Sequence, residues 1–373
     1  MMDWPLISSD SHVIEPSDLW TKRIDRHYRD RAPRLVNEGD HDRWVADSHF
    51  QMGNLGIVGG AGVRFEQPEA LSIQASYAGL RRGGFDPDAR MIDLDREGVR
   101  LEILHSTVTS HAYRIPDAGL VGAIFGAYND WLAEFCASHP TRLKGLALLN
   151  VDDVEATVAE LERCAKLGMI GAMIPVSLGA ARSYGEPAFD RLWAAACALA
   201  MPLTLHVGTQ RWSANTVSVE QHTASVLNLI NRDVEIRTTV ADLILSGVVE
   251  RFPALRLICS EYELSWVPHF LFRLDDYYDN RALGRHGHRF ADNQRPSDLF
   301  RRNFYVSFQE DPYGLAYLDA IGPQAVLWGS DYPHTESTFP RSREILAGLL
   351  AQVPEARQKA ITADNTARLY GLS

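Results

Sequence analysis

Cysteine is scarce in this chain, and its cysteines are widely separated. Four are present, none of them in a CxxC pair, at Cys136, Cys164, Cys197 and Cys259. Closely spaced cysteines are the signature of zinc sites and redox motifs, and dense cysteine frameworks belong to small secreted domains. We therefore expect free thiols that take no part in the chemistry of the protein.

Clusters of positive charge and long apolar segments are also missing from the sequence. The 37 basic residues are outnumbered by 48 acidic ones, and no group of Lys and Arg is dense enough to follow a phosphate backbone. The most apolar stretch, 192–205, is too short to span a bilayer and contains Pro202. The first residues lack the basic region and apolar core of a secretion signal. We expect a soluble, cytoplasmic protein that binds a small molecule, with neither nucleic acid nor membrane as a partner.

What the sequence does contain is a series of short runs rich in aliphatic and β-branched residues. Segments with helical periodicity separate most of them. Residues 156–167, for example, place their apolar side chains near one stripe and are followed by Gly168, as expected after a helix C-terminus. This alternation predicts an α/β fold, a TIM-like (β/α)8 barrel. A doubly wound open sheet has a similar pattern, but no GxGxxG motif follows the first run. The runs are 6–10, 101–105, 143–150, 172–175, 203–206, 255–260, 304–307 and 325–329.

The connection between the first two predicted strands is far longer than an ordinary loop. Loops in compact domains usually have about 4–6 residues, so this stretch must form structure of its own. We predict a single domain, 1–373, in which 20–90 forms an insertion or a lid over the mouth of the barrel. A surface excursion without a role in catalysis is the alternative.

Residue types that bind metals recur at the ends of the predicted strands. The first strand ends in Asp10 and His12, the fifth in His206, the sixth in Glu261 and the eighth in Asp331. Asp10 and His12 are two residues apart, so a strand places both side chains on one face. In an α/β barrel the carboxyl ends of the strands meet at one mouth, where catalytic groups lie. Imidazole and carboxylate together suit a divalent cation, so we predict a metal site there, with Glu261 as the fifth candidate ligand.

Four segments make the chain similar to a known family. They are Asp-Ser-His-Val-Ile-Glu-Pro at 10–16, Leu-His-Val at 205–207, Gly-Ser-Asp-Tyr-Pro-His at 329–334 and Asp-Asn-Thr-Ala-Arg-Leu-Tyr-Gly at 364–371. The chain resembles the amidohydrolase-related branch of the amidohydrolase superfamily, which includes aminocarboxymuconate semialdehyde decarboxylase and other non-oxidative decarboxylases. The resemblance implies a barrel with zinc or manganese at its mouth, held by Asp10, His12, His206 and Asp331. Members often form dimers, so a homodimer is one expected assembly.

Two positions depart from the pattern that the resemblance implies. The first ligand, commonly His in the family, is Asp10, and the sixth-strand position, a catalytic His in the decarboxylases that look most similar, is Glu261. An imidazole can shuttle a proton at neutral pH, whereas a carboxylate beside a cation stays ionised and serves as a base or a ligand. The fourth strand also lacks the Lys that bridges two metals in binuclear members, which leaves Glu261 as the bridge if two metals bind.

Three more side chains lie near the predicted mouth. His334 and Glu15 each follow a predicted ligand by three residues and can line the site. Glu15 also precedes Pro16, so anchoring a turn is its structural alternative. His105 ends the second strand, where the family has no fixed ligand, and we interpret it as a polar wall residue.

Arg273 is a candidate for binding the substrate. A similarly placed Arg in the decarboxylases that the chain resembles binds the substrate carboxylate, in some cases across a dimer contact. A helical ion pair between Arg273 and Asp276 is the structural alternative.

The predicted function is hydrolysis or non-oxidative decarboxylation of a small carboxyl-bearing substrate by a metal-dependent enzyme. The cation would polarise a substrate oxygen and lower the pKa of bound water to about 7. Glu261 and Asp331 would be catalytic, Glu261 by accepting a proton from water. A binuclear non-haem iron oxygenase on the same barrel is an alternative, because the carboxylates exceed what one zinc ion needs. A non-catalytic binding scaffold is the third hypothesis.

Overall fold

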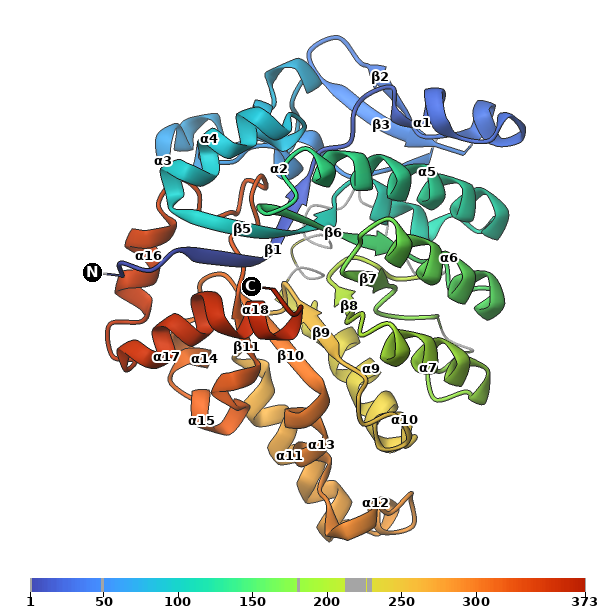
Figure 1. Cartoon of the computed structure of the whole chain (residues 1–373), viewed down its shortest axis with the longest axis vertical. Helices are drawn as coiled ribbons and strands as arrows, with labels where there is room; N and C mark the ends of the chain where they lie inside the picture. Colours follow the sequence, from blue (N-terminus) through green and yellow to red (C-terminus); the bar gives the residue numbers. More distant parts are fainter. Residues whose placement is uncertain (1, 48–49, 180–181, 212–225, 227–229, 373) are drawn as a thin grey trace.

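Parallel strands form the centre of the protein. The computed structural model describes residues 2–47, 50–179, 182–211, 226 and 230–372. Within them, eight strands form one sheet in the order β1-β5-β6-β7-β8-β9-β10-β11, and helices surround it (Figure 1). Each predicted run overlaps one of these strands, so the predicted α/β barrel is confirmed. The strands are β1 (Leu6–Val13), β5 (Val99–Ser106), β6 (Leu143–Leu148), β7 (Gly171–Ile174), β8 (Leu203–His206), β9 (Leu257–Ser260), β10 (Phe304–Phe308) and β11 (Val326–Trp328).

The sheet curls round until β1 meets the end of β11. The backbone N–H of Asp331 donates to the carbonyl of Asp10 at 2.9 Å, and that of His12 donates to the carbonyl of Tyr332 at 2.6 Å. Gly329 permits this approach, because a Cβ at that position would lie 2.5 Å from the Cβ of Asp10. Two strand ends that carry predicted ligands are therefore held side by side.

Helices cover the outside of the sheet. The helix α6 (Val154–Lys166) begins after Asp153, whose side chain accepts a hydrogen bond from the N–H of Ala156. It is followed by Gly168 in the left-handed region, with φ of 89°, as the sequence predicts. Among the described residues, no helix combines the length and apolar character needed to cross a membrane. The other helices that follow strands are α5 (Ala118–Ala137), α7 (Asp190–Ala198), α9 (Asp233–Leu245), α10 (Val248–Arg251), α11 (Trp266–Asn280), α12 (Ala282–Arg285), α13 (Pro296–Asn303), α14 (Pro312–Leu315), α15 (Leu318–Ile321), α16 (Ser342–Leu349), α17 (Glu355–Lys359) and α18 (Asn365–Leu369).

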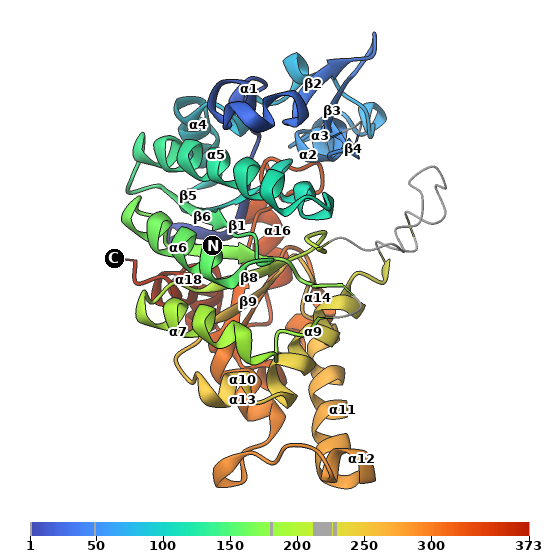
Figure 2. The same cartoon turned by 90° about the vertical axis from the view of Figure 1, so that its right-hand side faces the viewer.

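The long connection between β1 and β5 forms structure of its own at one end of the molecule (Figure 2). Its antiparallel sheet consists of β2 (Arg34–Asn37), β3 (Asp42–Ala46) and β4 (Phe50–Gln51). Its helices are α1 (Leu19–Arg23), α2 (Leu55–Val58) and α3 (Val63–Glu66), and α4 (Pro87–Glu97) leads into β5. The role of 20–90 as a lid within a single domain stays a prediction.

Candidate active site

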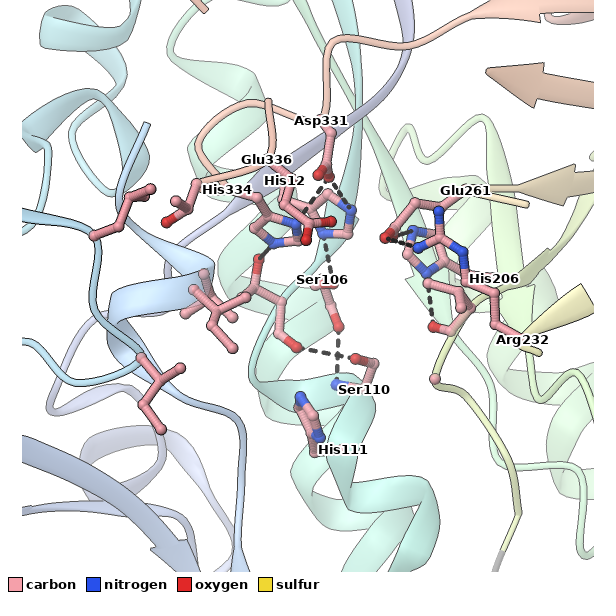
Figure 3. A pocket seen from close by; sticks show the side chains of 18 of the residues that line it. His12, Ser106, Ser110, His111, His206, Arg232, Glu261, Asp331, His334 and Glu336 are labelled. Atoms are coloured by element: carbon pink, nitrogen blue, oxygen red, sulfur yellow. Dashed lines mark hydrogen bonds and ion pairs between the residues drawn. The ribbon is translucent and has the colours of Figure 1, made fainter. Parts of the chain in front are cut away.

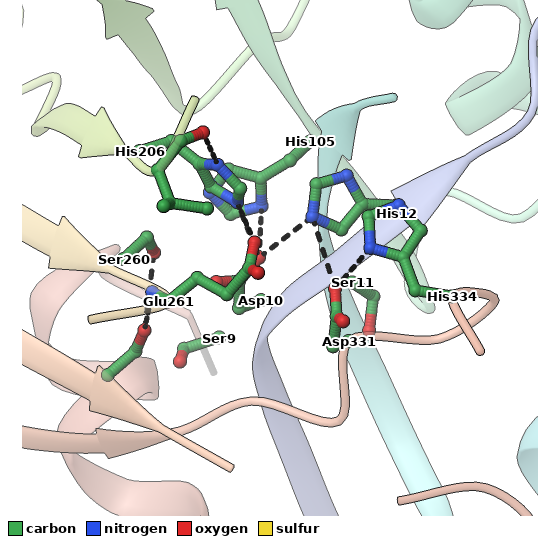
Figure 4. A network of polar contacts seen from close by, with 12 residues as sticks. Ser9, Asp10, Ser11, His12, His105, His206, Ser260, Glu261, Asp331 and His334 are labelled. Atoms are coloured by element: carbon green, nitrogen blue, oxygen red, sulfur yellow. Dashed lines mark hydrogen bonds and ion pairs between the residues drawn. The ribbon is translucent and has the colours of Figure 1, made fainter. Parts of the chain in front are cut away.

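The structure gathers the predicted metal ligands at the carboxyl ends of β1, β8 and β11 (Figure 4). The Nε2 atom of His12 lies 3.4 Å from Oδ1 of Asp10 and 3.4 Å from Oδ1 of Asp331. The Nε2 atom of His206 lies 3.6 Å from the same Oδ1 of Asp10. These four residues are at most 4% exposed, so water does not screen their side chains from one another.

Four atoms of this cluster are buried without a hydrogen-bond partner: Oδ1 of Asp10, Nε2 of His12, Nε2 of His206 and Oδ1 of Asp331. The ligand atoms of Asp10, His12 and His206 lie within 4.8 Å of one another. The other nitrogen of each ring is engaged, because Nδ1 of His12 donates to the carbonyl of Ser106 and Nδ1 of His206 to that of Val207, both at 2.9 Å. A carbonyl can only accept, so each neutral ring presents a lone pair at Nε2. Unpaired buried polar atoms are costly, and one cation would satisfy the atoms of Asp10, His12 and His206. The donor set therefore fits a divalent metal ion.

A second group of ligand-type residues overlaps the first. His12, Glu261, Asp331 and His334 each offer one ligand atom, and these atoms lie within 4.8 Å of one another. The Nδ1 atom of His334 is 2.8 Å from Oδ1 of Asp331, and its Nε2 is 3.2 Å from Oγ1 of Thr107. Because His12 belongs to both groups, the site offers ligands for one cation or for two neighbouring ones.

Glu261 and Asp331, the two residues predicted to be catalytic, share an unusual backbone conformation. Their φ angles are 65° and 59°, in the left-handed region that L-residues rarely adopt. Each such residue costs about 1–3 kcal/mol, and such strain is concentrated at functional sites. Glu261 comes directly after β9, and Asp331 comes three residues after the end of β11, at the mouth where the chain turns over the barrel.

The charges of the metal-binding cluster depend on one another. Burial opposes the charge of Asp10, but His105 and His206 outweigh it and hold the pKa of Asp10 well below its usual value. Burial also opposes the charge of His206, yet Asp10 and Glu261 raise the pKa of His206 to about 9. Burial and the nearby His334 lower the pKa of His12 to about 3. A metal ion would therefore meet an ionised Asp10 and a neutral His12, and would displace the proton of His206.

Glu261 lies at the side of the cluster. Its Oε2 atom is 3.4 Å from Nε2 of His206, and its Oε1 atom is 3.3 Å from Nη1 of Arg232. Burial and the charge of Asp331 raise the pKa of Glu261 to about 8. Glu261 is therefore the carboxyl group of the site that most readily carries a proton.

A cavity of about 530 Å³ lies over the cluster. Figure 3 shows its polar residues on one side and, opposite them, side chains carried by the blue ribbon of the insertion. Cavities of this volume suit small organic ligands. The polar lining comprises His12, Ser72, Ser106, Thr107, Ser110, His111, His206, Arg232, Glu261, Asp331, His334, Thr335 and Glu336, and the apolar lining comprises Ile57, Val58, Leu71, Ile73 and Val207.

Two residues singled out in the sequence lie elsewhere. The carboxylate of Glu15 accepts hydrogen bonds from the backbone N–H groups of Val108 at 3.1 Å and Thr109 at 2.9 Å, and from the hydroxyl of Thr109 at 2.7 Å. Glu15 therefore anchors the turn after β5, because the strand β1 has already ended. Arg273 is exposed on α11, with its guanidinium 4.9 Å from the ring centre of Tyr277, away from the cavity.

Three residues of the site are not among the predicted ligands or catalytic groups. His105, which the sequence predicts to be a polar wall residue, has its Nδ1 3.2 Å from Oδ1 of Asp10. Arg232 directly precedes α9 and reaches Glu261, although no spacing rule linked the two. His111 lines the cavity, and burial lowers its pKa to about 3. Only His105 had a signal, its place at a strand end.

Known proteins resemble this chain over most of its length. A family model described as "Amidohydrolase" matches residues 40–372. Gamma-resorcylate decarboxylase of Polaromonas sp. strain JS666 is 26% identical over 318 residues, which cover 78% of this chain and 93% of that protein.

Two solved structures share the fold. An amidohydrolase from Mycobacterium avium subsp. paratuberculosis aligns over 100% of both chains with a TM-score of 0.78 and 20% identity. A 5-carboxyvanillate decarboxylase from Novosphingobium aromaticivorans, complexed with manganese and 4-hydroxy-3-methoxy-5-nitrobenzoic acid, aligns over 99% of this chain and 97% of that chain, with a TM-score of 0.69 and 18% identity.

Proposed function

Because this chain belongs to the amidohydrolase family, we propose that it is a metal-dependent, non-oxidative decarboxylase of a small aromatic carboxylic acid. The observation that carries the proposal is the buried set of unpaired ligand atoms on Asp10, His12 and His206 beside a ligand-sized cavity. Relatives named as decarboxylases support this reaction over hydrolysis.

Asp10, His12 and His206 would hold the metal, with Asp331 beside them. Manganese is the first choice, because a structural relative carries it together with an aromatic acid. A divalent cation at this place supplies a positive charge that binds substrate oxygens and draws electron density from the reacting carbon. The hydrogen bonds from His12 to Ser106 and from His206 to Val207 fix the tautomers that such binding requires.

The protein must also supply a proton. In the proposed reaction the bond between the ring carbon and the carboxylate breaks, CO₂ leaves, and a proton takes its place on the carbon. Glu261 and the Asp331–His334 pair face the cavity and are the groups that can hold this proton. Glu261 stands where the similar decarboxylases keep His, and Arg232 and His206 orient it.

The test is a decarboxylation assay on protein loaded with Mn²⁺. We expect release of CO₂ from gamma-resorcylate or 5-carboxyvanillate, the acids named in the relatives, and loss of activity on chelation. A matched control uses the methyl esters of the same acids, which cannot lose CO₂ directly. Hydrolysis of the esters without any decarboxylation of the acids would replace the proposal with the hydrolytic alternative.

A second candidate function is hydroxylation by a two-iron centre, with dioxygen and an external reductant as co-substrates. The observation that favours it is the pair of overlapping ligand groups that share His12. A metal count on protein purified without chelator separates the two functions. About two irons per chain with a visible absorption band supports the oxygenase, and one colourless metal supports the decarboxylase.

A further inference from the structure

The wall of the cavity that faces the metal ligands is largely apolar, and several of its side chains are exposed. It consists of Ile57 and Val58 from α2 and of Leu71 and Ile73 from the 71–73 segment, in which Ser72 also lines the cavity. Ile57 is 40% exposed, Leu71 is 50% exposed and Ile73 is 59% exposed. Large aliphatic side chains gathered at a cavity with this much free surface mark a place where an apolar group binds.

This apolar wall is built into the fold. The N–H of Gly56 donates to the carbonyl of Ile73 at 3.2 Å, and a Cβ at position 56 would lie 2.2 Å from the carbonyl oxygen of Ser72. Only glycine therefore allows α2 to approach the 72–73 segment this closely. The contact fixes the position of Ile57 relative to Ile73.

The apolar wall is hydrogen-bonded to the loop that carries Asp331 and His334. The N–H of Thr335 donates to the carbonyl of Ile57 at 2.7 Å, and Thr335 directly follows His334. The loop that carries Asp331 and His334 thus holds the wall at a set distance from the cluster. A ligand bound at the cluster therefore shares its cavity with this wall.

The volume of the cavity indicates the size of the ligand that it can enclose. A volume of about 530 Å³ is in the range of pockets that enclose drug-sized ligands, so it leaves room for a group beyond a single ring. With its carboxylate at the cluster, an aromatic acid directs its para position away from the metal ligands. The groups available opposite the cluster are aliphatic side chains of the insertion.

We propose that the substrate is an aromatic acid with an apolar extension of several carbons, an alkyl chain or a second ring, that packs against Ile57, Leu71 and Ile73. This inference rests on the proposed decarboxylation, because that reaction places the carboxylate at the cluster. It adds the part of the substrate that the metal ligands do not recognise, and it gives the insertion a role in specificity.

The first measurement is binding, which does not depend on turnover. Dissociation constants of 4-n-alkylbenzoates, from benzoate to 4-pentylbenzoate, are measured by calorimetry on the manganese-loaded protein. We expect the Kd to fall about fourfold for each added methylene, the value for complete burial of a CH₂ group. A Kd that is constant or rises along the series, or the absence of binding by every member, overturns the inference.

Two variants test whether the apolar wall causes the dependence of Kd on chain length. Ile73→Ser and Leu71→Ser should flatten the dependence of Kd on chain length, and both positions are already half exposed, so the fold tolerates the change. Leu283→Ser on α12, where Leu283 is 85% exposed and outside the cavity lining, is the matched control and should keep the full dependence. An equal response of Ile73→Ser and Leu283→Ser would contradict a specific role of the wall.

The second measurement separates this inference from the proposed function. Turnover of 4-alkyl-2,6-dihydroxybenzoates is followed as CO₂ release. If the unsubstituted acid is decarboxylated but neither kcat/KM nor Kd improves along the series, the proposed decarboxylation stands and the apolar extension of the substrate is ruled out. If Kd falls along the series but no CO₂ is released, the proposed decarboxylation is ruled out and the inference that the site binds acids with an apolar extension stands.

Discussion

Arg232 holds the carboxylate of Glu261 from one side, with Nη1 3.3 Å from Oε1, so that the other oxygen of Glu261 faces His206. Arg232 also lines the cavity. The pair joins the metal-binding cluster to a guanidinium that sequence spacing did not single out. In the proposed mechanism, Arg232 would therefore orient the group that handles the proton.

Replacement of Arg232 should therefore slow the reaction while the metal stays bound. We expect Arg232→Gln to lower kcat about tenfold, which corresponds to about 1.4 kcal/mol. Arg232→Lys should restore part of the loss, because a positive charge remains. Arg273→Gln, on the exposed face of α11, is the control and should leave kcat and KM unchanged. If Arg273→Gln is the more damaging variant, the substrate is bound across a subunit contact, as the family resemblance implies.

Glu261→Gln should separate proton transfer from metal binding. The amide keeps the shape of the side chain but cannot transfer a proton, so kcat should fall by roughly 10²-fold or more. Metal content, measured by atomic spectroscopy, should stay near that of the parent protein. Loss of the metal together with activity would instead make Glu261 a ligand, and unchanged kcat would remove it from the mechanism.

Metal removal should weaken the fold as well as abolish activity. Free metal at 100 times its Kd stabilises a native state by about 2.7 kcal/mol, so chelation should lower the Tm measurably. His206→Ala should abolish this metal-dependent shift, because it removes Nε2 of His206, one of the unpaired ligand atoms of the cluster. His139→Ala, which removes a solvent-exposed pairing with Asp88 outside the cavity lining, is the matched control. A metal-dependent Tm that survives in His206→Ala would contradict the assigned site.

His105 tests whether a side chain next to Asp10 contributes to metal binding. Its Nδ1 lies 3.2 Å from Oδ1 of Asp10, and both ring nitrogens are buried without a hydrogen-bond partner. His105→Phe should weaken metal binding by about 10- to 100-fold, the usual effect of losing a group that orients a ligand. Unchanged metal affinity, measured by competition with a chelator, would leave His105 as a wall residue.

Glu15 should prove important for stability and dispensable for metal binding. Glu15→Ala leaves the N–H groups of Val108 and Thr109 without their acceptor, which should lower the free energy of unfolding by about 2–4 kcal/mol. Glu15→Gln retains one acceptor oxygen and should cost less. Urea titration measures both effects. A loss of bound metal in natively folded Glu15→Gln would return Glu15 to the ligand set.

The barrel and the family were both predictable from the sequence. Strand runs such as 203–206 are short, largely apolar and end in a ligand-type residue. Parallel strands in a barrel bring their carboxyl ends to one mouth. His206 and Asp331 could therefore be placed together although they are distant in the chain. The family expectation is confirmed by the family model, which matches residues 40–372 and so includes the motif around Asp331 but not the one around His12.

The partners of individual side chains were not predictable in the same way. Glu15 and His334 both follow a ligand by three residues, yet Glu15 turns to the backbone of Thr109 and His334 turns to Asp331. Spacing along the chain determines the direction of a side chain only while the regular strand continues. Beyond the last strand residue, turn geometry decides, and it depends on contacts with other strands.

The sequence by itself determined the order of strands and helices, the residue types at the mouth and the family, because periodicity and local motifs are properties of contiguous residues. Only the tertiary structure decided that Arg232 reaches Glu261, that His105 supports Asp10 and that the insertion places Ile57 and Ile73 opposite the cluster. Each of these relationships joins residues from separate elements. Their distances are set by barrel closure and loop packing, which no local pattern encodes.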